Sequence, residues 1–158
     1  MLFRSRDGKD EIAQALVIKN TIPNVSAVLF SKTGVASALK KLDPDLNRLK
    51  IAGDWMLYSE MLLQGNIAFV SKSLNNHRRH TRSVTINPRN NATHMAEILF
   101  MQERLAKSIG EISDSTRQQA EEFARHAAQH LGMNEHEYPS ISEGVKIKLD
   151  QLRTEITC

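Results

Sequence analysis

The chain has 158 residues, of which 41% are hydrophobic and 25% charged, as expected for one folded domain with its own core. Its 21 basic and 18 acidic residues give a formal net charge of +3, too balanced to predict a nucleic-acid binder. Cys158 is the single cysteine, which excludes an intrachain disulfide and fits a reducing compartment. We expect a location in the cytoplasm, or at the inner face of the membrane, because the chain shows neither an export signal nor a transmembrane segment.

The first half of the chain predicts a mixture of helices and strands. Apolar residues recur with helical spacing from Ile12 to Val17 and are followed by a turn at residues 20–24. Residues 25–30 and 66–70 are short apolar runs, which predict two buried strands. Helices are predicted at residues 33–42 and 54–64, the second followed by Gly65 as its terminator. This order indicates an α/β layer with few strands, which in isolation amounts to an α+β fold.

The second half predicts helices only, after a loop at residues 85–91. One apolar face runs from Met95 to Ile109. A second runs from Ala120 to Leu131, with Ser115 and Gln118 spaced as a capping box and Gly132 at its end. A third lies at residues 141–152. We therefore divide the chain into residues 1–86 and a helical extension, 87–158, whose apolar faces should pack on each other, on the first half or on a second copy.

Asp54 opens the second predicted helix, and its position allows two interpretations. An aspartate in the first turn is stabilised by the helix dipole and by free backbone amides, which is a purely structural role. A carboxylate at the mouth of a cleft can instead accept a proton from a substrate hydroxyl as a general base. Position alone leaves both interpretations open.

The cluster HRRHTR at residues 77–82 is the second candidate for chemistry. Arginine forks bind phosphate oxygens and neutral imidazole can ligate a divalent metal, so a metal-bound diphosphate would suit both. The alternative is a solvated basic turn. Binding to nucleic acid is disfavoured because no aromatic residues flank the arginines. His126 and His130 are four residues apart on a predicted helix, but without a His-Glu-x-x-His pattern we expect them on its exposed face.

Four stretches in this order resemble a known family: NTIPNVSAVLF from residue 20, AGDWMLY from residue 52, GNIAFV from residue 65 and LNNHRRHTRSVT from residue 74. Together they look like the C-terminal half of the catalytic domain of glycosyltransferase family 2, the inverting GT-A enzymes. The resemblance covers about residues 19–85, and several linked motifs in register are more specific than any one alone.

For the acceptor side, the resemblance implies that Asp54 is the catalytic base that deprotonates an acceptor hydroxyl. Trp55 would sit against the acceptor or brace the helix. Asn24 and Ser26 would stand at the start of a sheet strand and face the acceptor cleft. These roles come from the resemblance and not from spacing.

For the donor side, the resemblance places Arg78 and Arg79 near the diphosphate of a nucleotide-sugar donor, with His80 approaching a divalent metal, Mn or Mg. Arginines and a cation would stabilise the charge that develops on the leaving diphosphate.

The sequence also departs from the family, because nothing in it supplies the nucleotide-binding half and its Asp-x-Asp motif. Residues 43–45, Asp-Pro-Asp, match the Asp-x-Asp pattern but are predicted to form a loop between helices. We therefore expect sugar transfer to a glycan acceptor, in cell-surface polysaccharide synthesis, from the full-length enzyme and not from this chain alone. The alternative is a catalytically inactive helical module for binding or oligomerisation.

Overall fold

The computed structural model describes residues 3–22, 24–46, 48–76 and 87–133, and most of them are helical. None of the helices in these ranges is long and apolar enough to cross a membrane. The elements in chain order are β1 (Phe3–Asp7), α1 (Gly8–Glu11), the π-helical turn η1 (Ile12–Leu16), the 3-10 turn η2 (Val25–Ala27), α2 (Lys32–Leu46), α3 (Gly53–Leu62), β2 (Asn66–Val70), the 3-10 turn η3 (Pro88–Asn90), α4 (Asn91–Ile109) and α5 (Asp114–His130).

β1 and β2 form a two-stranded antiparallel sheet in which Phe3 is opposite Val70 and Asp7 is opposite Asn66. The prediction of a strand at residues 66–70 is confirmed. Its predicted burial is wrong, because the strand alternates between exposed and half-buried residues and, within the described ranges, pairs with β1 alone. β1 was not predicted, since the sequence FRSRD lacks apolar alternation and forms a strand by pairing with β2.

The predicted strand at residues 25–30 is wrong. Its first three residues form η2, in which the amide of Val28 donates to the carbonyl of Val25. Its apolar side chains are not buried, and Leu29 is fully exposed. A strand needs a partner for its backbone groups, and β2 pairs with β1 instead. The described fold is therefore a helix-rich mixed fold and not a layer built on two buried strands.

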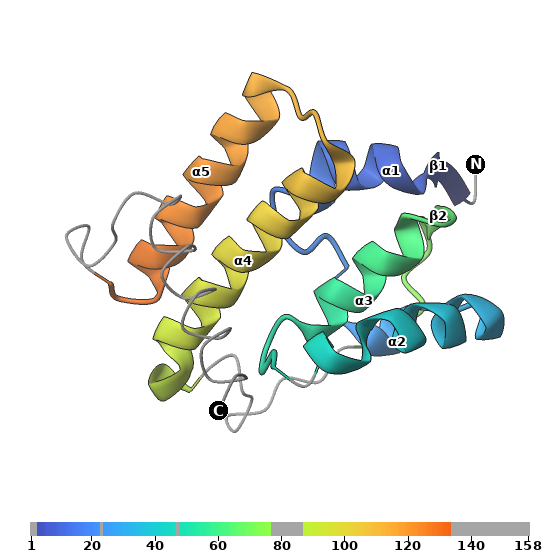
Figure 1. Ribbon diagram of the computed structural model, residues 1–158, viewed down its shortest axis with the longest axis horizontal. Coiled ribbons are helices and arrows are strands. Elements are labelled where there is room, and N and C mark those ends of the chain that lie inside the picture. Colours follow the sequence, from blue (N-terminus) through green and yellow to red (C-terminus); the bar gives the residue numbers. More distant parts are fainter. Residues whose placement is uncertain (1–2, 23, 47, 77–86, 134–158) are drawn as a thin grey trace.

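The helices predicted at residues 33–42, 54–64, 95–109 and 120–131 are confirmed as α2, α3, α4 and α5. Figure 1 shows α4 running between α5 on one side and α3 with α2 on the other. The main core is shared by η1, α2, α3 and α4, so it includes residues from both sides of position 86. Its most buried members are Ile12, Leu16, Val17, Leu42, Met56, Met101 and Leu105. α5 adds small residues, Ala124 and Ala128, packed against Met95 and Leu99 of α4.

The observed helix boundaries differ from the predictions in two places and match them in one. The cap of α5 is Ser113, whose hydroxyl accepts from the amide of Thr116, and not the predicted Ser115. Gly132 follows α5 with a φ of 70°, as a helix-terminating glycine requires. α2 continues through residues 43–45, so the predicted loop there is wrong. The packing of the buried Leu42 and the partly buried Leu46 against the core favours the helix despite the proline. The helix predicted at residues 141–152 lies outside the described residues.

Gly8 allows α1 to approach the C-terminal end of α3 very closely. A Cβ atom at this position would lie 2.1 Å from the carbonyl oxygens of both Leu62 and Gly65. The close approach holds the junction of β1 and α1 against the segment that leads from α3 into β2.

Candidate functional site

Asp54 lies in the first turn of α3, with its side chain half-buried. Its Oδ1 atom accepts a hydrogen bond of 2.6 Å from the backbone amide of Trp55. The same oxygen accepts from the Nδ2 atom of Asn20 at 3.4 Å. One bond is local to the helix, whereas the other joins two segments that are 34 positions apart in the sequence.

Burial raises the pKa of the Asp54 carboxyl above its usual value, and the hydrogen bond from the amide of Trp55 acts in the opposite direction. The carboxylate therefore binds a proton more strongly than a free aspartate does. Higher proton affinity is what a general base needs at neutral pH.

Tyr58 lies one turn further along α3 on the same face as Asp54. Its ring is buried and stacks against Phe30, with the two ring centroids 6.1 Å apart. Within the described ranges, its hydroxyl has no hydrogen-bond partner. Burial, and then the charge of Asp54, raise the pKa of Tyr58 well above its usual range. Tyr58 is therefore a neutral neighbour of Asp54 that sequence analysis missed.

Trp55 is buried in the core, where its Nε1 atom donates to the carbonyl oxygen of Leu16 at 3.2 Å. The indole ring thus braces α3 against η1. The sequence left two placements for Trp55, against the acceptor or bracing the helix, and the observed placement is the second.

The loop before α3 is held by Glu97, a buried residue in the middle of α4. Its carboxylate accepts hydrogen bonds of 2.7–2.8 Å from the backbone amides of Lys50, Ile51 and Ala52. Glu97 could not be singled out from the sequence, since an acidic residue on a helix is usually exposed. It satisfies three amides that precede Asp54 and so fixes the start of α3.

The turn that carries Asn20 is held by Gln102, another buried polar residue of α4. The Nε2 atom of Gln102 donates to the carbonyl oxygens of Ile18 and Ala120, both at 2.9 Å. The bond to Ile18 fixes the chain two residues before Asn20. A polar residue within an otherwise apolar stripe was the available signal in the sequence, but its partners are too distant in the chain to be predicted.

Asn24 and Ser26 lie near the surface, in and just before η2. The hydroxyl of Ser26 donates to Oδ1 of Asn24 at 2.5 Å, and the carbonyl of Ser26 accepts from Asn75 beyond β2 at 2.9 Å. In the part of the chain that the structure describes, no hydrogen bond joins Asn24 or Ser26 to Asp54.

The other predicted site residues, Arg78, Arg79 and His80, lie outside the described residues. Among the residues that the structure does describe, no cluster of three or more histidine, cysteine, aspartate or glutamate side chains is placed to hold a metal. His126 and His130 are exposed on α5, as predicted.

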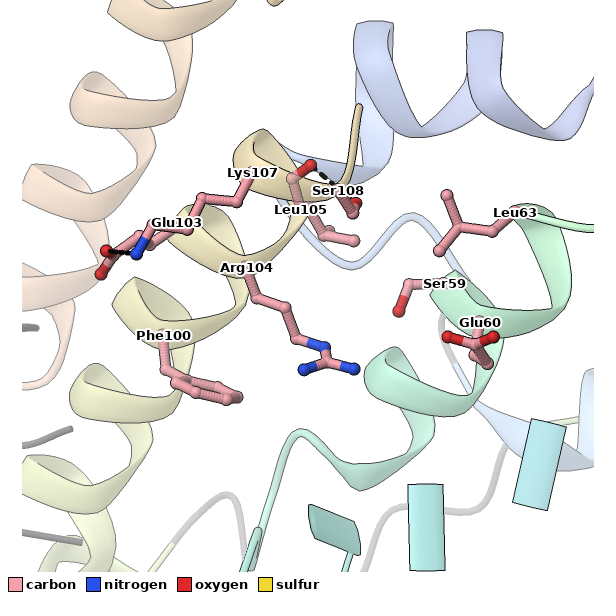
Figure 2. A pocket seen from close by; sticks show the side chains of 9 residues that line it. All are labelled: Ser59, Glu60, Leu63, Phe100, Glu103, Arg104, Leu105, Lys107 and Ser108. Atoms are coloured by element: carbon pink, nitrogen blue, oxygen red, sulfur yellow. Dashed lines mark hydrogen bonds and ion pairs between the residues drawn. The ribbon is translucent and has the colours of Figure 1, made fainter. Parts of the chain in front are cut away.

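A pocket of about 460 Å³ lies between α3 and α4, toward the opposite end of α3 from Asp54. Figure 2 shows Arg104 reaching from α4 toward α3, whereas Glu103 and Lys107 pair with each other and point the other way. On the α3 side, Glu60 pairs with Lys41 of α2 at 2.9 Å. Because Asp54 does not line this pocket, the two are separate features.

Comparisons with protein-family models, with curated proteins and with solved structures found no match to this chain.

Proposed function

We propose that this chain is the acceptor-side part of a glycosyltransferase of the family 2 type, with Asp54 as its catalytic base. The reaction would join a sugar from a nucleotide-diphosphate donor to a hydroxyl of a glycan acceptor, in cell-surface polysaccharide synthesis. The proposed setting is the cytoplasm or the inner face of the membrane.

The observation that supports this proposal most directly is the state of the Asp54 carboxylate. It is half-buried at a helix N-terminus and accepts hydrogen bonds from the amide of Trp55 and the side chain of Asn20, and burial raises its pKa. In the proposed step, the carboxylate removes the acceptor proton while the acceptor oxygen bonds to the anomeric carbon and the bond to the diphosphate breaks. The helix start is itself fixed by Glu97, which would keep the base in place during this step.

On the donor side, Arg78 and Arg79 would bind the leaving diphosphate, and His80 would approach a divalent metal that neutralises its charge. The described residues offer no metal-binding cluster, so this part of the proposal depends on the segment at 77–82 and on the resemblance.

The first test is sugar transfer by the full-length gene product with Asp54→Asn. We expect turnover to fall by at least about 100-fold, because general base catalysis contributes about that factor or more. Asp114→Asn is the matched control, since Asp114 also lies in a helix first turn but is exposed on α5. Unchanged turnover in a folded Asp54→Asn protein would reject the base assignment.

The second test is titration calorimetry of this chain with nucleoside diphosphates and manganese or magnesium. Binding that is lost in Arg79→Ala and kept in Arg125→Ala, an exposed arginine of α5, would support the donor-side role of the basic cluster. Equal binding by both variants, or no binding at all, would count against that role in this chain.

The alternative, an inactive oligomerisation module, would need free apolar helix faces. The face of α4 is not free, because Met95, Ile98, Met101 and Leu105 are buried within the chain. The other stripe considered for this role, at residues 141–152, lies outside the described residues. Light scattering over a dilution series tests it, and a monomer at all concentrations would reject it.

A further inference from the structure

Asn20 has an amide whose orientation is determined by its surroundings. The backbone N–H of Ile22 donates to Oδ1 of Asn20 at 3.1 Å, which closes a local turn. Since an N–H group needs an oxygen acceptor, this bond distinguishes the oxygen from the nitrogen of the amide. The Nδ2 atom must then be the one that faces Asp54, as a donor.

The turn that carries Asn20 is well anchored. Ile22 is 8% exposed, and the carbonyl of Ile18 accepts the hydrogen bond from Gln102. Two residues further back, the carbonyl of Leu16 accepts from the indole of Trp55. These contacts tie the turn to both α3 and α4, so Asn20 presents its donor from a fixed backbone.

The two donors to Asp54 meet at one atom. The amide of Trp55 and the Nδ2 atom of Asn20 both bind Oδ1, so neither of these two donors occupies Oδ2. The bond from Trp55 comes from the adjacent residue and holds the carboxylate at one point. The bond from Asn20 comes from a separate segment and fixes the rotation of the carboxylate about that point.

We propose that Asn20 is a positioning residue that holds the Asp54 carboxylate by Oδ1 and turns Oδ2 toward the hydroxyl of an acceptor. This inference deepens the proposed function, on which it rests. The contact of 3.4 Å is long for a hydrogen bond, as is common for catalytic contacts in the absence of substrate.

The test is a carbon NMR titration of the Asp54 carboxyl in the full chain labelled with ¹³C-aspartate, with the signal assigned by its loss in Asp54→Asn. In Asn20→Ser the short side chain can still close the turn with Ile22 but cannot reach Asp54. We expect the Asp54 pKa to rise, because a donor to the charged form has been removed. In Asn20→Asp the turn is also kept, and the added negative charge should raise the pKa further.

The matched control is Asn24→Ala, since Asn24 is a neighbouring asparagine that binds Ser26 and not Asp54. Tyr58 stays neutral over the whole titration range and does not distort the curve. An Asp54 pKa in folded Asn20→Ser that equals the wild-type value, or a rise of the same size in Asn24→Ala, overturns the proposal.

A second readout separates this proposal from the proposed function. In the full-length gene product, the pH profile of kcat/KM should move its acid limb upward in Asn20→Ser. If the NMR shift occurs while Asp54→Asn leaves sugar transfer intact, Asn20 positions Asp54 but Asp54 is not the base. If Asp54→Asn abolishes transfer and the NMR shift is absent, the base role stands and the positioning role of Asn20 fails.

Discussion

Ala52 and Glu97 are 45 positions apart in the sequence, yet the backbone amide of Ala52 donates a hydrogen bond of 2.7 Å to the buried carboxylate of Glu97. The amides of Lys50 and Ile51 donate to the same carboxylate. The N-terminus of α3 is therefore prepared by a side chain of α4 and not by a capping residue of its own, since Ala52 has no side chain that can cap.

Glu97→Ala should destabilise the protein by about 3 kcal/mol, because three backbone amides, including that of the buried Ala52, lose their acceptor. Glu97→Gln keeps one acceptor oxygen and should cost less. Urea unfolding, followed by the fluorescence of the single tryptophan, measures both. Glu121→Ala on the exposed face of α5 is the control and should change stability by less than about 0.5 kcal/mol. Equal effects of the two alanine variants would refute the anchoring role of Glu97.

Asp54→Asn should stabilise the fold at neutral pH. The pKa of Asp54 in the folded state lies above its ordinary value of 3.8. At pH values between the unfolded and the folded pKa, the folded protein therefore binds more protons than the unfolded chain. The wild-type protein therefore loses stability as the pH rises through this range and Asp54 becomes charged. Asparagine carries no charge, so the substitution removes that loss. The gain should disappear below about pH 3.8.

Thermal unfolding at a series of pH values measures this effect, with Asp114→Asn as the matched control. Asp114 is exposed in the first turn of α5, where a negative charge favours the helix, so its replacement should lower stability by about 0.5 kcal/mol. At neutral pH the two aspartate substitutions are thus expected to change stability in opposite directions. A loss of stability in Asp54→Asn at neutral pH would contradict the buried-carboxylate account.

His94 should make the fold sensitive to mild acid. Burial lowers the pKa of its imidazole below 6.5, and the nearby charge of Glu97 only partly opposes this. The unfolded chain therefore binds the proton more readily, and stability should decline as pH falls through 6.5. His94→Gln should flatten the stability curve between about pH 7.5 and pH 5. His126→Gln, at an exposed site on α5, should leave the curve unchanged, and equal slopes in all three proteins would contradict the prediction.

Gly8→Ala should destabilise the protein by about 3 kcal/mol, because the added Cβ would meet two backbone oxygens that cannot move aside as a side chain can. Gly53→Ala is the control, since its Cβ would lie 3.9 Å from Leu46, an ordinary contact. Thermal unfolding of both variants decides the matter. Similar melting temperatures would mean that the junction of β1 and α1 is not held against α3 in solution.

The elements that the sequence predicted well are the ones whose signal is local. α4 and α5 follow from apolar periodicity, and the apolar faces of both find partners within the chain. The error at residues 25–30 arose because a run of branched apolar residues predicts a strand only if a partner strand exists, which no local pattern reports. β1 was missed for the converse reason, since its strand conformation depends on β2, which lies more than 50 positions further along the chain.

The candidate site shows the same division. Asp54 at a helix start could be found from the sequence, and the structure places it there. Its contact with Asn20 depends on how η1 packs against α3, and the support from Glu97 and Gln102 depends on how α4 packs against both. Each of these contacts joins residues that are more than 30 positions apart, so no spacing rule could indicate them.

α4 also has a mechanical consequence for the site. Glu97 holds the loop that leads into Asp54, and Gln102 holds the turn that carries Asn20. These two anchors are separated by five residues of one rigid helix, or about 7.5 Å along its axis. The relative position of Asp54 and Asn20 therefore depends on that helical segment as well as on the direct packing of η1 against α3. A change that shifted the register of α4, even far from either residue, would alter the geometry of the carboxylate before it altered the fold.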